Sequence, residues 1–167
     1  VYLPRVKEYM LKACMEATVY TDWINQNEPY EKAILDFTDA VLNPDTNNPF
    51  WETFIPFEQK IAFYGVFNSL SQVLLKMALP GVPDLYQGTE LWNLSLVDPD
   101  NRRPVDYSLR HELLREIRKD AQKDPLDLLL RLWEEKEDGR IKLYITYQAL
   151  QARLEREKLF KQGSYTP

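Results

Sequence analysis

The residues of this chain that are best suited to chemistry gather in one stretch, residues 79–106. Side chains that can bind a polar ligand follow one another closely there: Tyr86, Gln87, Glu90, Trp92, Asp98, Asp100, Arg102 and Arg103. Four prolines interrupt the stretch, and each removes a backbone donor and disfavours helix in the residue before it. We therefore predict a stiff, non-helical binding loop presented by a scaffold. The alternative is a surface connection that is polar because water surrounds it.

The scaffold is predicted from the periodicity of apolar residues and from its interruptions by proline, glycine and asparagine. A mainly α-helical chain is expected, with one short extended segment at residues 82–86 inside the proline-rich loop. An aromatic cluster that includes Phe50, Trp51 and Phe54 should precede the longest helix, either as a core plug or as a surface on which sugars stack. The predicted helices are 4–20, 29–42, 57–79, 106–120, 125–136 and 139–158.

Composition excludes several classes of function. The 167 residues carry a net charge of −5 and have a pI near 5.0. A nucleic-acid-binding protein would instead be expected to carry a basic patch that binds phosphates. No apolar run is long enough to cross a membrane. His111 is the only histidine and Cys14 the only cysteine, so the sequence predicts no metal site, no catalytic triad and no cofactor. A lone cysteine is compatible with the reducing cytoplasm, where we expect the protein.

Two runs in the loop carry a resemblance to a known family. They are PGVPDLYQGTELW (residues 80–92) and SLVDPDNRRPVDYSLR (residues 95–110). Together with KACMEATVYTDWINQNEPYEKA, FNSLSQVLLKMALPG and DGRIKLYIT, they resemble maltooligosyl trehalose synthases, which are (β/α)8-barrel enzymes of the alpha-amylase clan. The first run resembles the clan in general, and the part from Asp98 to Asp106 resembles the synthases in particular. Asn93 stands where an aspartate is expected in the family.

The resemblance implies a helical, bundle-like fragment of such a barrel. Residues 1–78 would be the helical region before the last barrel strand, and residues 79–106 that strand with its substrate-binding loop. Residues 107–167 would be C-terminal helices leading towards a β-rich domain. The extended segment 82–86 would then lack its neighbouring strands. Its exposed edge would allow self-association by strand pairing between two copies of the chain.

The resemblance also implies a function. The synthases convert the reducing-end α-1,4 link of maltooligosaccharides into an α,α-1,1 link by intramolecular transglycosylation. Their catalytic carboxylates lie on earlier barrel strands, so none of the loop carboxylates Asp84, Glu90, Asp98 and Asp100 should be catalytic. The isolated chain should be inactive. The predicted substrate-binding residues are a polar clamp of Asp98, Asp100, Arg102 and Arg103, with a wall of Tyr86, Gln87 and Trp92. The alternatives are a helical protein-interaction module or part of another amylase-clan transglycosylase.

Overall fold

The computed structural model describes residues 2–44, 47–96 and 102–164, and it is mainly α-helical. This part of the chain contains no β-strand, and residues 82–86 are neither helical nor paired, as predicted. The mainly α fold class is therefore confirmed. The helices are α1 (Tyr2–Ala17), α2 (Glu28–Leu42), α3 (Pro49–Ala78), α5 (Tyr107–Lys123), α6 (Pro125–Glu134), the 3-10 turn η1 (Lys136–Asp138), α7 (Arg140–Glu155) and α8 (Glu157–Gln162).

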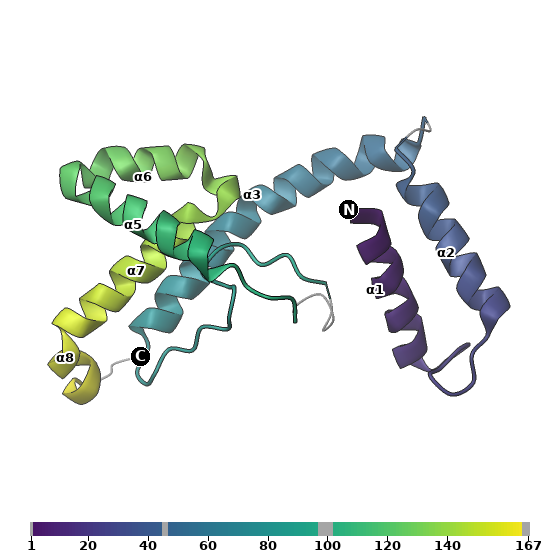
Figure 1. Cartoon of the computed structure of the whole chain (residues 1–167), viewed down its shortest axis with the longest axis horizontal. Coiled ribbons are helices and arrows are strands. Elements are labelled where there is room, and N and C mark those ends of the chain that lie inside the picture. Colours follow the sequence, from purple (N-terminus) through teal and green to yellow (C-terminus); the bar gives the residue numbers. More distant parts are fainter. Residues whose placement is uncertain (1, 45–46, 97–101, 165–167) are drawn as a thin grey trace. The chain divides into compact units, whose positions relative to one another are not determined.

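The chain divides into two compact units, and helix α3 begins in the first and ends in the second. The first unit comprises residues 1–61 and 94–103. In it α1 and α2 lie side by side (Figure 1), and an ion pair of 2.7 Å joins Lys7 of α1 to Asp39 of α2. Asn27 begins α2 by accepting a hydrogen bond from the backbone amide of Tyr30, as expected of an N-cap asparagine.

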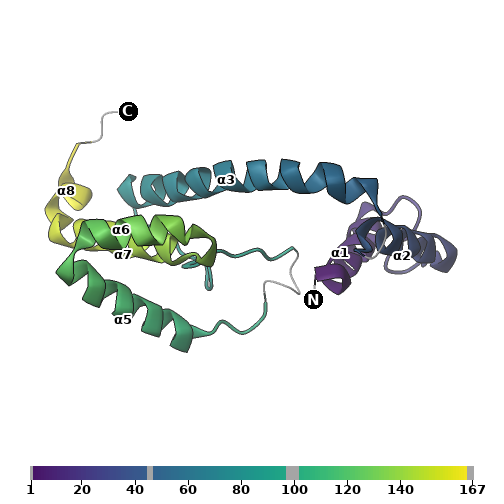
Figure 2. The same ribbon diagram turned by 90° about the horizontal axis from the view of Figure 1, so that it is seen from above.

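The second unit comprises residues 62–93 and 104–167, and it contains the main hydrophobic core. Helices α5, α6 and α7 lie on one side of the C-terminal half of α3 (Figure 2). Phe67 of α3 packs against Trp133 of α6, with ring centroids 5.0 Å apart. The buried residues of this core are Leu70, Ile117, Leu128, Leu132, Ile141 and Leu143.

The predicted start of helix α3 is wrong. The sequence pattern predicts a start at Phe57, after Pro56, but α3 begins at Pro49 and continues through Pro56. The start is set by Asn48, whose side chain accepts a hydrogen bond from the Phe50 amide and donates one to the carbonyl of Val41 at the end of α2. The aromatic cluster therefore lies within the first turns of α3, where Phe50 and Phe54 stack with centroids 4.9 Å apart.

Other helix predictions hold in outline. Helix α7 ends at Glu155 and a separate short helix α8 follows, in place of one continuous helix to residue 158. The apolar spacing of the second helix predicts that Phe37 points inwards with Ile34 and Val41, but Phe37 is 65% exposed. The apolar spacing of α3 predicts a buried stripe that includes Phe63, Leu70, Leu74 and Met77. Leu70 and Met77 are buried, whereas Phe63 and Leu74 are about half exposed.

Candidate functional site

The predicted wall residues Tyr86 and Gln87 lie in a tight turn of the second unit. The amide of Thr89 donates a hydrogen bond of 3.0 Å to the carbonyl of Tyr86, and the Thr89 hydroxyl donates to the same oxygen at 2.6 Å. Gly88, the third residue of the turn, has a φ of +86°, which a glycine adopts without strain. Gln87 therefore lies at the tip of the turn, and the side chains of Tyr86 and Gln87 are exposed.

The side chain of Arg110 on α5 donates hydrogen bonds to this turn and to Glu90 directly after it. Its Nη2 donates to the carbonyl oxygen of Gly88 at 2.9 Å, and its Nε donates to the Glu90 carboxylate at 3.0 Å. The two side chains are largely buried, with 15% of Arg110 and 24% of Glu90 exposed. Asp106 caps α5 by accepting a hydrogen bond from the Leu109 amide, so the helix that carries Arg110 is itself fixed beside the loop.

The third predicted wall residue, Trp92, packs against the start of α7. Its indole Nε1 donates to the carbonyl of Lys136 at 2.7 Å. Gly139 lies so close that a Cβ atom there would be 2.9 Å from the backbone nitrogen of Trp92. The Lys142 ammonium lies 5.5 Å from the centroid of a Trp92 ring and donates to the carbonyl of Leu91 at 3.3 Å. Trp92 therefore has a fixed orientation, and its polar atom is already used within the protein.

A cavity of about 410 Å³ adjoins the turn. Its polar lining combines acceptors and donors, as a hydroxyl-rich ligand requires. Burial lowers the pKa of Lys142, and the nearby Lys76 ammonium lowers it further. The lining residues are Ser69, Gln72, Val73, Lys76, Asp84, Leu85, Tyr86, Thr89 and Lys142. Among the predicted site residues that the structure describes, Tyr86 is the one that lines this cavity.

The described residues of the predicted polar clamp belong to a different unit from the wall residues. Arg102 and Arg103 are exposed, engage in interactions of their own, and belong to the first unit. Asp98 and Asp100 lie outside the described residues. The structure thus places Tyr86, Gln87 and Trp92 in one unit and the two clamp arginines in the other.

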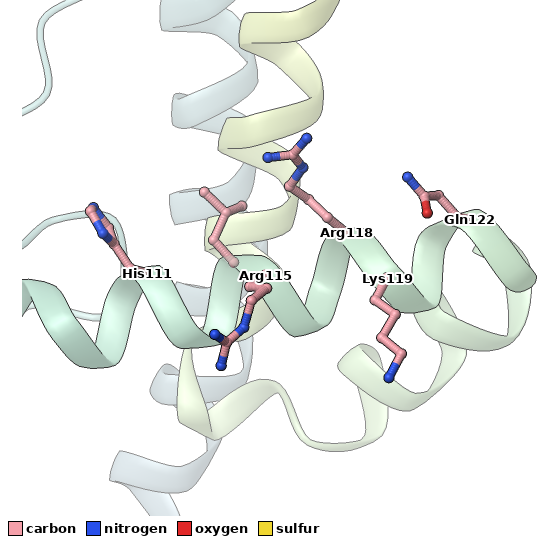
Figure 3. A pocket seen from close by; sticks show the side chains of 6 residues that line it. His111, Arg115, Arg118, Lys119 and Gln122 are labelled. Atoms are coloured by element: carbon pink, nitrogen blue, oxygen red, sulfur yellow. The ribbon is translucent and has the colours of Figure 1, made fainter.

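A second hollow, of about 490 Å³, follows the surface of α5 (Figure 3). His111, Arg118 and Lys119 are among its lining residues, but their side chains point in different directions from the helix. Arg118 turns towards the ring of Tyr147 on α7, 5.7 Å from its centroid. Because these groups do not converge on one point, the hollow is an ordinary solvated helix surface.

Two further classes of site are absent from the described residues. No group of histidine, cysteine and carboxylate side chains there could hold a metal ion. Among the same residues, no helix is both long enough and apolar enough to span a membrane.

Comparison with known proteins identifies a clear group of relatives. The chain is 37% identical to a crystal structure of a maltooligosyl trehalose synthase, with a TM-score of 0.80 over 96% of this chain and 21% of the other. It is 36% identical to the maltooligosyltrehalose synthase from Arthrobacter ramosus, with a TM-score of 0.76 over 96% of this chain and 20% of that enzyme. The resemblance to maltooligosyl trehalose synthases is confirmed.

The chain matches only a small part of each synthase. A provisionally assigned maltooligosyl trehalose synthase of Mycobacterium tuberculosis is 39% identical over 113 residues, which are 68% of this chain and 14% of that protein. The chain therefore spans about one seventh of this curated relative and one fifth of the solved synthases. No family model matches the chain.

Sequence reasoning missed the residues that hold the wall in place. Arg110 ends the second family-like run but is separated from Glu90 by 20 positions, and Lys142 is 51 positions from Leu91. The periodicity of apolar residues along one helix contains no information on contacts between distant elements. One signal was available for Gly139, since a glycine directly before a helical pattern marks a position that needs a left-handed or close-packed backbone.

Proposed function

We propose that this chain forms part of the sugar-binding wall of an enzyme that makes maltooligosyl trehalose. The observation that carries the proposal is the agreement, over 96% of the chain, with the backbone of a solved synthase at 37% sequence identity. Such an enzyme is an isomerase of the alpha-amylase clan, and its substrate is a maltooligosaccharide. We place it in the cytoplasm.

The proposed reaction is an intramolecular transglycosylation. A carboxylate nucleophile attacks the anomeric carbon of the last α-1,4 link, the bond to the terminal glucose breaks, and that glucose takes a proton on its O4. The anomeric hydroxyl of the same glucose then attacks the anomeric carbon of the covalent intermediate and forms the α,α-1,1 link. The bond to the enzyme carboxylate breaks, and the hydroxyl proton returns to the enzyme's acid/base group. We assign no catalytic carboxylate to this chain.

The proposed task of this chain is to bind and orient the substrate and to exclude water. Tyr86, Gln87 and Trp92 would form the wall, with Trp92 giving shape and Gln87 offering an amide to sugar hydroxyls. Asp98, Asp100, Arg102 and Arg103 would form the polar clamp, because an arginine fork can hold two oxygen atoms at once. In this proposal residues 1–78 and 107–167 are the scaffold on the two sides of the 79–106 binding segment.

A chimaera tests the proposal. Residues 1–167 replace the matching segment of the Arthrobacter ramosus synthase, and the product of maltopentaose is followed by chromatography. We expect loss of reducing ends and a trehalose-capped product from the chimaera, and no activity from the 167-residue chain alone. Activity of the chain alone would mean that it contains the catalytic carboxylates and would contradict the assignment. A folded but inactive chimaera would contradict the proposed function.

The clamp is tested in the same chimaera by Arg102→Ala. Loss of a charged hydrogen bond of roughly 1.5–3 kcal/mol lowers kcat/KM by about 10- to 160-fold. Arg115→Ala is the matched control, because Arg115 is exposed on α5 and pairs only weakly with Glu112 at 3.6 Å. Unchanged kinetics of Arg102→Ala together with a lower melting temperature would show that Arg102 stiffens the loop without binding sugar.

A further inference from the structure

We propose that Arg110 is a positioning residue, which fixes the turn of residues 86–89 in the shape that presents Gln87 and Tyr86. Its effect on catalysis rests on the proposed function. Its effect on the turn rests only on contacts within the second unit.

All three nitrogen atoms of the Arg110 guanidinium are engaged. The Nη2 group binds the Gly88 carbonyl at 2.9 Å, the Nε group binds Glu90 at 3.0 Å, and the Nη1 group binds the Asp106 carbonyl at 3.1 Å. Two of these acceptors belong to the turn and its exit, and the third is the cap residue of α5. One side chain therefore joins the loop to the first turn of the helix that follows it.

The surroundings of Gly88 show why the turn needs such a contact. Gly88 is buried, and a Cβ atom at this position would lie 3.2 Å from Val105 and 3.7 Å from the Arg110 guanidinium. Its carbonyl is accordingly withdrawn from water and needs a donor from the protein, since a buried carbonyl without a partner is costly. Arg110 supplies that donor.

A lysine could not replace Arg110 fully. The guanidinium is a rigid fork whose donors point in fixed directions, whereas an ammonium is a single point of charge on a flexible stem. Lysine could reach the Glu90 carboxylate or the Gly88 carbonyl, but it would not hold both at the observed angles. The geometry therefore distinguishes an orienting function from simple charge pairing with Glu90.

Amide hydrogen exchange tests the effect of Arg110 on the turn in the 167-residue chain. The reporter is the Thr89 amide, which is bonded to the Tyr86 carbonyl. In Arg110→Gln we expect this amide to exchange at least about tenfold faster, because the turn opens locally. In Arg110→Lys we expect an intermediate rate, and in the control Arg115→Gln no change. The amide of Ile117, in the core of α5, should keep its rate in all three variants.

Two outcomes of that experiment would overturn the inference. One is an unchanged Thr89 rate in Arg110→Gln. The other is an equal acceleration at Thr89 and Ile117, which would mean that Arg110 supports the whole unit and does not act on the turn.

Kinetics of the chimaera test the effect on catalysis. With Arg110→Gln we expect kcat to fall about 10- to 100-fold, as for a modest misplacement of binding groups, with a smaller fall for Arg110→Lys. A residue that only stabilises the fold would leave kcat per folded molecule unchanged, and that result would overturn the catalytic part. If the unmodified chimaera is inactive, the proposed function fails, while the exchange rates still decide whether Arg110 fixes the turn.

Discussion

Replacement of Gly139 by alanine is expected to destabilise the second unit more than the same replacement at Gly65 or Gly81. Gly139 joins η1 to α7 with a φ of +81°, and its α-carbon faces the backbone of Trp92. An added Cβ would lie 2.9 Å from the Trp92 nitrogen and 3.2 Å from Trp92 Cδ1. Real Cβ atoms do not approach a backbone atom so closely, so α7 and the Trp92 segment would have to separate.

The magnitude has two parts. A residue other than glycine in the left-handed region costs roughly 1–2 kcal/mol. Forcing packed elements apart costs roughly a further 1–3 kcal/mol. The sum, about 2–5 kcal/mol, is a large fraction of the stability of a typical domain, about 5–15 kcal/mol.

Urea unfolding, followed by circular dichroism and tryptophan fluorescence, measures this loss. Gly81→Ala is the matched control, because Gly81 has a φ of +101° but no atom within 4 Å of its Cβ position, so only the backbone cost applies. Gly65→Ala, inside α3 with open space around it, should instead gain roughly 0.5–1 kcal/mol. If Gly139→Ala and Gly81→Ala lose equal stability, the close packing of Trp92 on the start of α7 is refuted.

Two further predictions concern basic side chains of α7. Arg153 donates to the carbonyl of Met77 in the last turn of α3 and to those of Leu79 and Gly81 after it. Arg153→Gln should therefore lower the free energy of unfolding by about 1–3 kcal/mol, measured in urea against Arg156→Gln as an exposed control. Burial and the Lys76 ammonium lower the pKa of Lys142, so NMR titration of its side chain should give a pKa below that of the exposed lysines, and Lys76→Gln should raise it. At pH values between the lower pKa of Lys142 in the folded chain and its higher pKa in the unfolded chain, unfolding takes up a proton. The free energy of unfolding therefore rises as the pH increases through that range. A Lys142 pKa equal to that of exposed lysines would contradict the burial.

The sequence allowed the helices of this chain to be predicted well, because their signals are local. The starts of α2, α5 and α6 each follow an asparagine or aspartate whose side chain caps the helix, at Asn27, Asp106 and Asp124. The predicted start of α3 is wrong because the aromatic cluster was expected to precede the helix, whereas the Asn48 side chain accepts a hydrogen bond from the Phe50 amide and the helix begins before the cluster. A proline removes one hydrogen bond, but a cap followed by a proline at the first helical position favours a start there.

The buried faces were predicted less well than the helices. The sequence pattern of α6 predicts an apolar face of Leu126, Leu129, Leu130 and Trp133, yet Leu128 and Leu132 are the buried residues. The apolar surface of this helix is broad, because it includes Leu126, Leu128, Leu129, Leu130, Leu132 and Trp133, and the pattern does not show which part of that surface is buried. The neighbouring helices decide it, and their positions depend on contacts between distant residues.

The site shows the same division between local and distant information. The turn at Tyr86–Thr89 and the special φ of Gly88 could be expected from a loop with glycine beside polar residues. The partners of that loop could not, since Arg110, Lys136 and Lys142 come from helices 20 to 51 positions away. The assignment of Asp98, Asp100, Arg102 and Arg103 as a clamp stays a prediction, as does self-association through residues 82–86.

One regularity connects these contacts. The segment before and through the turn is held at three places, at its beginning by Arg153, at Gly88 and Glu90 by Arg110, and at Trp92 by the carbonyl of Lys136. All three supports come from later residues of the same unit. The proposed wall is therefore held in place by the helices that follow it, and such pre-organisation would lower the entropic cost of binding the proposed sugar ligand. Substitutions at the supports should reduce kcat through the wall's shape, whereas substitutions at exposed Gln87 should change KM and leave the turn intact.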